Sequence, residues 1–202
     1  DWLIPGRFIL RIPGSHSILL YLYRVSSTWF YYDSPIGIIR ICEKDHSIQS
    51  ISFTEEIAKP DQSDSSPVIQ SCFDQLDAYF KGTLKVFDLP LAQHGTDFQL
   101  RVWQQLQQIP YGETISYLKL SVQFGNPKAI RAVGTANGKN PFAIVVPCHR
   151  VIGSHGEMTG YGGKIWRKKW LLDLVAIATV TDIVPLVGEN RVLETARTCS
   201  GR

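Results

Sequence analysis

The chain has 202 residues, enough for one well-packed core or two small domains, and its 44% hydrophobic and 19% charged residues are ordinary for a soluble globular protein. This composition excludes a chain dominated by disorder. The sequence has no apolar run of eighteen residues, and charged residues and prolines interrupt its N-terminal stretch, which predicts neither membrane insertion nor export. The four cysteines lie far apart without a Cys-x-x-Cys pair, which predicts a reducing compartment and neither a zinc knuckle nor a disulfide framework.

The charge is unevenly distributed. The net charge is +3, but residues 101–170 contain ten Lys and Arg against two Asp and Glu, and the rest of the chain is net acidic. A basic block of this kind suits a polyanion, because neutralising phosphates supplies most of the non-specific affinity for nucleic acid. A solvated basic face without a partner is the alternative.

The first half of the chain predicts a small sheet with a helix. Residues 1–30 form an N-terminal extension to which no element is assigned. Residues 34–41 and 46–53 have the composition of two antiparallel strands joined by a polar turn at 43–45. A loop rich in Asp, Ser and Pro follows, and apolar residues recur at helical spacing from Val68 to Phe80. Residues 31–90 are therefore predicted to form an N-terminal α/β domain.

The second half predicts mostly helices. Thr96 and Gln99 form a candidate capping box for an amphipathic helix that ends before Pro110. Ser116 can cap a helix that begins at Tyr117. The fold class is therefore α+β, with a mostly helical C-terminal domain at residues 91–175.

A second helix follows closely and completes a helix-turn-helix. After a break at Gly125, Asn126 is its candidate N-cap, Pro127 its first residue, and Gly138 lies past its end. Helix, tight turn and helix is a DNA-reading arrangement.

On this second helix, Ile130 and Val133 are expected to face the core. Ala129, Ala132 and Ala136 form a row of small residues along which another surface could approach closely. Packing against a neighbouring helix would explain the alanines equally well.

The tetrapeptide Pro147-Cys148-His149-Arg150 follows an apolar run and carries the candidate chemistry. An unperturbed thiol has a pKa of about 8.5, and neighbouring positive charge can lower the pKa enough to make a reactive thiolate. Cys148 is therefore a candidate nucleophile beside a histidine. The alternative is a small buried core residue.

Ordered blocks around this tetrapeptide resemble one family. They are Asn126 to Gly134, Pro147 to Val151, Gly160 to Gly163 and Lys169 to Leu172. In this order they resemble the methylated-DNA-protein-cysteine methyltransferases, also called O6-alkylguanine-DNA alkyltransferases. The likeness ends after Leu174, so residues 176–202 form an unassigned tail.

The resemblance implies DNA repair by direct reversal. A C-terminal helix-turn-helix domain would bind duplex DNA, rotate an O6-alkylguanine, or less readily an O4-alkylthymine, out of the stack, and transfer its alkyl group to a cysteine. Each molecule would react once, as a monomer, without cofactor, metal or membrane. The location would be the cytoplasm, or the nucleus in a eukaryotic host.

The resemblance assigns a catalytic role to four residues. Cys148 matches the alkyl acceptor, and His149 matches the residue that withdraws the thiol proton through a water. Tyr117 matches the tyrosine that aids rotation of the nucleotide and protonates the departing guanine at N3. Asn140 matches a hinge asparagine that ties the two halves of the site together. Without the resemblance, Asn140 before Pro141 would be a turn former.

Other residues are assigned to binding. Arg131 matches the arginine that fills the space left by the rotated base, and Ala129, Ala132 and Gly134 would lie against DNA. Val151 would offer its carbonyl to the guanine edge. Tyr161 and Gly162 fall on a lid loop over the base. By default, Arg131 would be solvated, Tyr117 would cover the edge of the core, and Tyr161 would anchor a flexible loop.

One position departs from the family pattern. The family places a glutamate that holds the histidine five residues beyond the position of Trp170, where this sequence has Val175. Losing an orienting acid slows such relays. Three functions therefore stay open. They are a suicide alkyltransferase, a non-catalytic reader of alkylated DNA, and a cysteine hydrolase, which fits least because hydrolases take their base from a distant position.

Overall fold

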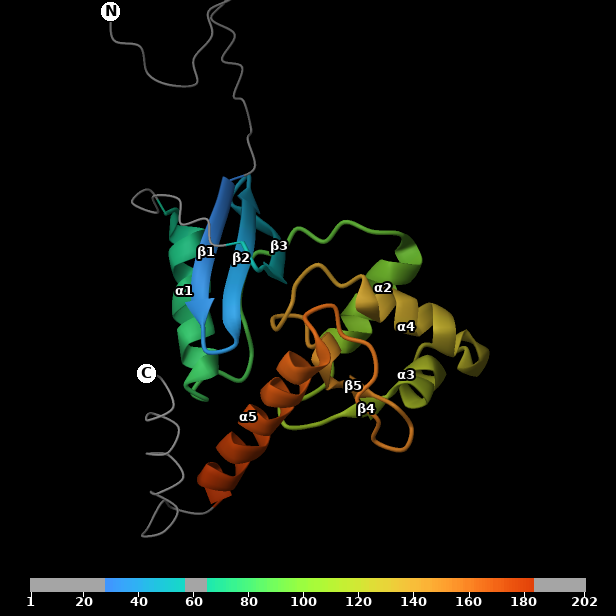
Figure 1. The fold of residues 1–202 in the computed structure, drawn as a ribbon. Coiled ribbons are helices and arrows are strands. Elements are labelled where there is room, and N and C mark those ends of the chain that lie inside the picture. The colour runs from blue at the N-terminus through green and yellow to red at the C-terminus, as the bar shows by residue number, and fades with distance from the viewer. Residues whose placement is uncertain (1–27, 57–64, 184–202) are drawn as a thin grey trace, which may run out of the picture.

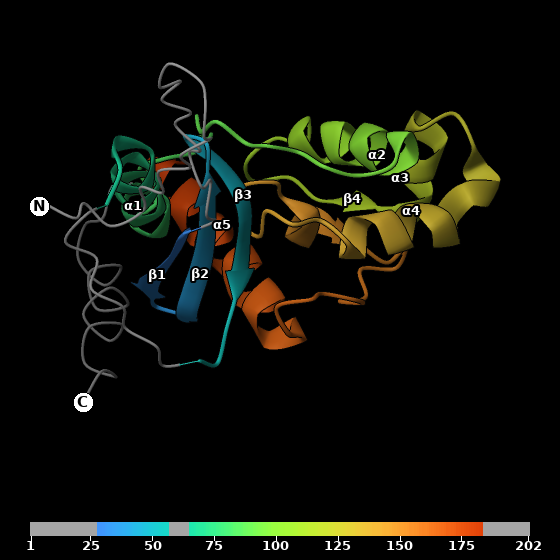
Figure 2. The same ribbon diagram turned by 90° about the horizontal axis from the view of Figure 1, so that it is seen from above.

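A computed structural model describes residues 28–56 and 65–183, with side chains described as far as residue 174. Most of the N-terminal extension and of the unassigned tail lies outside the described residues. The elements form two halves, a sheet with a helix and a helical half, and a long C-terminal helix runs beside both (Figures 1 and 2). This arrangement confirms the α+β class.

The first half is a three-stranded antiparallel sheet covered by one helix. Its strands lie in the order β1-β2-β3, and the elements are β1 Thr28–Ser34, β2 Gly37–Lys44, β3 Ser47–Phe53 and α1 Pro67–Phe80. Ser66 caps α1 by accepting a hydrogen bond from the Ile69 amide. Helix α1 packs its apolar side, which includes Leu76 and Tyr79, toward the sheet.

The strand prediction was wrong at its N-terminal end. Residues 34–41 do not form one strand, because the chain turns at residues 35 and 36 and Gly37 has a φ of 106°. The segment before this turn is the additional strand β1, which pairs along its whole length with β2. Strand β2 then continues to Lys44, so the polar turn between β2 and β3 is shorter than expected.

The second half is mostly helical, and the start signals of its first two helices were predicted correctly. Its elements are α2 Asp97–Gln107, β4 Ile115–Ser116, α3 Tyr117–Gln123, the 3-10 turn Pro127–Ala129, α4 Ile130–Gly138, the 3-10 turn Cys148–Arg150, β5 Val151–Ile152 and α5 Ile165–Ile183. Thr96 and Gln99 form the complete capping box of α2. Ser116 caps α3 by accepting from the Lys119 amide.

Helices α3 and α4 form the helix-turn-helix, but its second helix differs in detail. Asn126 caps the 3-10 turn and not α4, which begins later, at Ile130, and includes Gly138. Val133 is buried as expected, whereas Ile130 is 38% exposed, so its expected place in the core was wrong. Ala136 is 2% exposed and its carbonyl accepts from the Trp103 indole, so the row of small residues cannot be one exposed surface.

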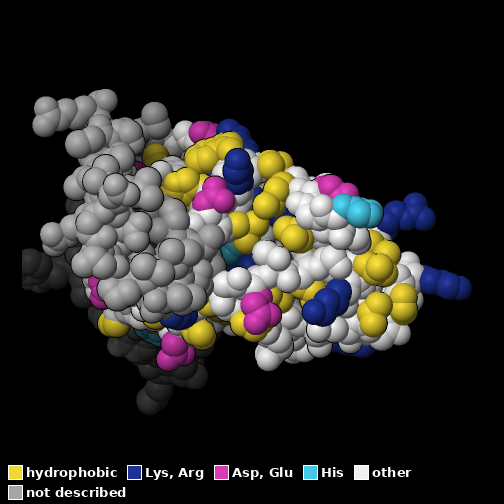
Figure 3. All heavy atoms as spheres, turned by 90° about the horizontal axis from the view of Figure 1, so that it is seen from below, with side chains coloured by type: hydrophobic (Ala, Val, Ile, Leu, Met, Phe, Trp, Pro, Cys, Tyr) yellow, Lys and Arg dark blue, Asp and Glu magenta, His cyan; other side chains and the backbone are white. Residues whose placement is uncertain are grey.

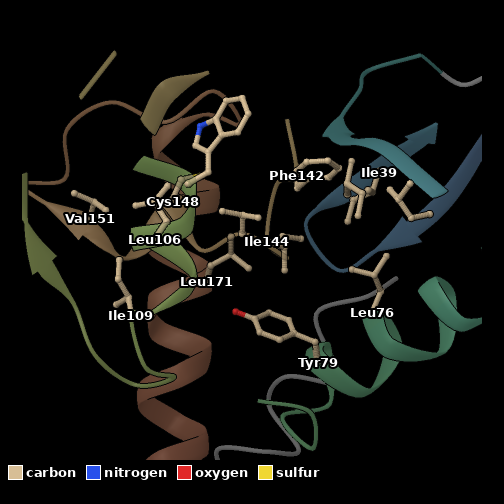
Figure 4. Packing of buried hydrophobic residues seen from close by; sticks show 14 of the residues in the cluster. Ile39, Leu76, Tyr79, Leu106, Ile109, Phe142, Ile144, Cys148, Val151 and Leu171 are labelled. Atoms are coloured by element: carbon tan, nitrogen blue, oxygen red, sulfur yellow. The ribbon is translucent and has the colours of Figure 1, made fainter. Parts of the chain in front are cut away.

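Backbone pairing joins the two halves. The Ile51 amide of β3 donates to the Pro141 carbonyl, and the Ala143 amide donates to the Ile51 carbonyl, both at 2.8 Å. On the same strand, Ile48 bonds to Pro90 and Ala92 of the connecting segment. One continuous cluster of buried side chains crosses this junction, with Phe142 between the sheet and the helical half (Figure 4).

Helix α5 is also attached to the sheet half. The buried Arg167 guanidinium donates to the Ile36 carbonyl at 2.7 Å, and its charge lies 4.7 Å from the centre of the Phe53 ring. Among the described residues, no helix has the length and apolarity needed to cross a membrane.

We expect Thr96→Ala to lower the free energy of unfolding by about 1 kcal/mol, because the amides at the start of α2 lose their capping partner. Urea unfolding should show a lower midpoint with an unchanged slope. Thr114→Ala, an exposed position outside the helices, is the control and should leave the midpoint in place. An equal midpoint for both variants would contradict a stabilising role for the capping box.

Candidate active site

The loop between α4 and Cys148 is folded by the side chain of Asn140. The Asn140 amide nitrogen donates to the carbonyls of Val146 at 2.9 Å and Phe142 at 3.2 Å, and its oxygen accepts from the Phe142 amide at 3.0 Å. These bonds hold the apolar run against the core and deliver Cys148 at the start of a 3-10 turn. Asn140 therefore shapes the loop that carries the thiol.

Cys148 lies at a cavity of about 250 Å³ that both halves of the protein build. Its side chain is only 7% exposed. One wall comes from β3, and the others come from the end of α4, the loop that follows it and the glycine-rich segment before α5. The lining residues are Ser50 to Phe53, Asn137, Gly138, Asn140, Pro141, Ala143, Cys148 and Gly160 to Gly163.

Opposing effects act on the Cys148 thiol. Burial raises its pKa above the ordinary value, while the hydrogen bond from Asn140 and the positive charge of Lys168 lower it. Burial is the largest effect, because removing the thiolate from water is costly. At neutral pH the free protein therefore holds Cys148 mostly as the thiol. Each hydrogen-bond donor or cation nearby stabilises the thiolate form.

His149 is fully buried beside Cys148. Burial lowers the pKa of its imidazole well below the ordinary value, and the charges of Arg150 and Lys168 lower it further. The ring is therefore neutral at neutral pH, with one nitrogen free to accept a proton. Its Nε2 lies 3.5 Å from the Tyr79 hydroxyl, and its Nδ1 has no hydrogen-bond partner in the described part of the protein.

Tyr117 and the buried Lys168 meet at one carbonyl. Lys168 donates to the carbonyls of Val151 at 2.6 Å and Thr159 at 2.8 Å, and the Tyr117 hydroxyl also donates to Thr159, at 3.4 Å. Asn137 donates to the Tyr117 oxygen at 3.5 Å. Burial, followed by the charge of Cys148, raises the pKa of Tyr117, so this phenol keeps its proton at neutral pH.

Sequence reasoning missed Lys168, Asn137 and Tyr79. Lys168 stands in the basic run 167–169, which looks like a solvated face, but it lies three residues before Leu171 and six before Leu174, both buried. Three-residue spacing on a helix indicates a common side, and this signal could have identified the lysine. Asn137 and Tyr79 carried no comparable signal.

The predicted lid residues lie at the cavity. Tyr161 and Gly162 line it, and the Tyr161 ring meets the edge of Phe53 from β3 at 6.5 Å between centres. The Tyr161 hydroxyl is buried and has no partner among the residues that the structure describes. Val151 is buried, and its carbonyl already accepts a hydrogen bond from Lys168.

The predicted DNA-contact residues do not line the cavity. Arg131 and Ala132 are exposed on α4, while Ala129 and Gly134 are half-buried. A side chain at Gly134 would contact the Tyr117 ring, since a Cβ there would lie 3.7 Å from it. Figure 3 shows Lys and Arg side chains projecting at the end of the molecule formed by the helical half. The helix-turn-helix therefore carries exposed basic side chains outside the cavity lining, at Lys119, Lys128, Arg131 and Lys139.

Fold and site together define a protein with a helix-turn-helix beside a buried, free cysteine. Two family profiles match the chain: 6-O-methylguanine DNA methyltransferase, ribonuclease-like domain, at residues 28–93, and the DNA binding domain of the same enzyme at residues 97–176. The chain belongs to the methylated-DNA-protein-cysteine methyltransferases, a family of DNA repair enzymes.

Individual relatives agree with these profiles. The methylated-DNA-protein-cysteine methyltransferase of Mycobacterium tuberculosis (strain H37Rv) is 49% identical over 145 residues, which cover 70% of this chain and 88% of the relative. The enzyme of the same name from Methanosarcina acetivorans is 45% identical over 147 residues, or 71% and 94% of the two chains.

Solved structures show the same fold. Mycobacterium tuberculosis OGT in complex with DNA is 46% identical, with a TM-score of 0.66 over 74% of this chain and 93% of that one. An O6-methylguanine DNA methyltransferase from Methanococcus jannaschii has a TM-score of 0.55 at 19% identity, over 72% and 92% of the two chains, and supports the fold alone.

We expect the alkylation rate of Cys148 by a haloacetamide to rise with pH from neutrality, because its raised pKa leaves little thiolate there. Lys168→Gln removes the charge but keeps N–H donors, so it should raise the thiol pKa and move the rate profile to higher pH. Lys169→Gln, an exposed neighbour on the same helix, is the matched control.

Mass spectrometry of the Cys148 peptide measures both profiles. Cys148→Ser gives the background from other cysteines. If Lys168→Gln retains its fold and reacts with the same pH profile as Lys169→Gln, then Lys168 does not stabilise the thiolate.

Proposed function

We propose that this chain repairs O6-alkylguanine, and less readily O4-alkylthymine, in duplex DNA by transferring the alkyl group once, to Cys148. The observation that carries the proposal is the position of this thiol, at a cavity directly beside the helix-turn-helix. A base within a duplex cannot present its alkyl carbon to such a cavity, so the nucleotide must first rotate out of the stack.

The proposed reaction exchanges one bond for another. The Cys148 sulfur attacks the alkyl carbon, a sulfur–carbon bond forms, and the bond from carbon to guanine O6 breaks. The thiol proton leaves through a water to His149, which is neutral and can accept it. Tyr117, which holds its proton at neutral pH, donates a proton to N3 of the departing guanine. The stable thioether consumes the protein, so the reaction is stoichiometric.

The remaining site residues have binding roles in this proposal. Arg131 on the exposed face of α4 fills the gap left by the rotated base, with a planar guanidinium suited to stacking. Tyr161 covers the base, and its buried hydroxyl, which has no partner within residues 28–56 and 65–174, supports a polar contact with the bound nucleotide. The protein would act as a monomer in the compartment that contains DNA, the cytoplasm or a nucleus.

We expect incubation with a duplex containing O6-methylguanine to make the Cys148 peptide heavier by one methylene group, with the reaction stopping after one equivalent. Intact mass and peptide mass spectrometry measure both results. Cys148→Ser should bind the same duplex without forming an adduct. Repeated turnover would contradict suicide transfer.

A second candidate function is a non-catalytic reader of alkylated DNA. His149 has no carboxylate among its described hydrogen-bond partners, and its pKa is lowered well below the ordinary value. A weaker base withdraws the thiol proton less readily. Binding without an adduct in the experiment above would favour this candidate.

We expect Val175→Glu to accelerate methyl transfer in a single turnover at neutral pH, on the order of tenfold, if a carboxylate there raises the histidine pKa by about one unit. Position 175 lies on α5, where the family pattern places its glutamate. Rapid-quench measurement of the adduct gives the rate. Val175→Gln is the control for size and polarity. Equal rates for Glu and Gln would exclude a contribution from the restored charge.

A further inference from the structure

Tyr79 reaches His149 from the other half of the protein. It lies on α1, seventy residues away in sequence, and its side chain is fully buried. Its ring packs against Phe87, with centres 5.1 Å apart, and edge-on against Tyr111 at 6.1 Å. Figure 4 shows its hydroxyl pointing away from α1 toward the helical half. The hydroxyl oxygen lies 3.5 Å from His149 Nε2.

We propose that the Tyr79 hydroxyl is a positioning residue for the reaction: it holds the His149 imidazole in one tautomer and orientation. This inference rests on the function proposed above and extends its proton path into the N-terminal half. Packing alone would be served by phenylalanine, whereas a buried hydroxyl needs hydrogen-bond partners, and this one has the Arg150 guanidinium and the His149 ring. Within the described residues, this hydroxyl is the only hydrogen-bonding group found on the His149 ring.

A hydrogen bond between Tyr79 and His149 Nε2 leaves the other ring nitrogen, Nδ1, available for the reaction. A neutral imidazole has one N–H and one lone pair, so the bond at one nitrogen decides what the other offers. If Nε2–H donates to Tyr79, Nδ1 keeps its lone pair, and Nδ1 has no described partner that would compete for it. This tautomer can receive the thiol proton through a water.

The charges around the ring make its orientation important. Arg150 and Lys168 both face His149 and lower its pKa, and the ionised Cys148 would be the nearby anion. Burial raises the pKa of Tyr79 to about 12, although the charge of Arg150 and the hydrogen bond that its guanidinium donates to the Tyr79 hydroxyl lower it. The phenol therefore stays neutral at neutral pH. It can fix the ring, but it adds no negative charge to stabilise the imidazolium, which leaves geometry as its contribution.

The test is Tyr79→Phe, which keeps the ring and removes only the hydroxyl. We expect the single-turnover rate of methyl transfer at neutral pH to fall about tenfold, with a changed pH profile and unchanged affinity for DNA. Tyr32→Phe is the matched control, because it also removes a tyrosine hydroxyl that bonds at α1, here to the exposed Asp77 carboxylate and not to His149. The control should react like the unaltered protein.

Nitrogen-15 NMR of labelled histidine provides a readout that a loss of stability would not imitate. The unaltered protein should show His149 in a single neutral tautomer with its proton on Nε2, and Tyr79→Phe should show averaging between tautomers. A single Nδ1–H tautomer or averaging in the unaltered protein would overturn the proposal, even if Tyr79→Phe does not fold. So would identical rates and spectra in both proteins.

The two proposals fail separately. If the unaltered protein forms no adduct with O6-methylguanine, suicide transfer is wrong, and with it the role of Tyr79 in transfer. The NMR spectra would then still decide whether Tyr79 fixes the tautomer. If the adduct forms normally in Tyr79→Phe, only the role of Tyr79 is wrong.

Discussion

The pairing of β3 with the loop before Cys148 is the constraint on which the site depends. Ile51 uses both its amide and its carbonyl to bond the segment from Pro141 to Ala143. An unpaired strand edge would expose its polar backbone groups, so this edge gains partners while the loop gains a fixed position. Asn140 then folds the rest of the loop onto the thiol. Because β3 also supplies a wall of the cavity, the same contacts that fix Cys148 fix the space in front of it.

The electrostatics of the site involve a conflict. Lys168 favours the thiolate of Cys148, and with Arg150 it also disfavours a proton on His149. The cations therefore help the nucleophile to ionise while they make its neighbouring base weaker. A carboxylate near the histidine would relieve this conflict, since it would offset the cations at the ring without removing Lys168 from the sulfur. The resemblance implies a glutamate at position 175, where this chain has valine, so its absence would leave the conflict in place. In our proposal the uncharged Tyr79 phenol supplies only the orienting part of that role.

Local signals in the sequence predicted local structure well. The capping residues Thr96 and Ser116 act within their own helical turns, so neighbouring residues suffice to identify them. The buried and exposed sides of α4 could not be predicted from neighbouring residues, because Ala136 is buried by contact with Trp103, which comes from another helix. Strand β1 was missed because its aromatic run lacks strict alternation, and only pairing with β2 identifies it. The contact between Tyr79 and His149 depends on how the two halves dock, which periodicity does not encode.

The sequence blocks that carry the family likeness fall between residues 126 and 172, and they understate how much of the site the N-terminal half builds. Strand β3 forms a wall of the cavity, and Phe53 on it supports the Tyr161 ring. Helix α1 reaches the proposed proton acceptor through Tyr79. Arg167 bonds the Ile36 carbonyl at the first turn of the sheet and the Gly163 carbonyl beside the lid residues. The sheet half thus touches the thiol's cavity, its base and its lid. It follows that the helical half could keep every motif residue and still lack the finished site, since these three contacts would be lost with the sheet.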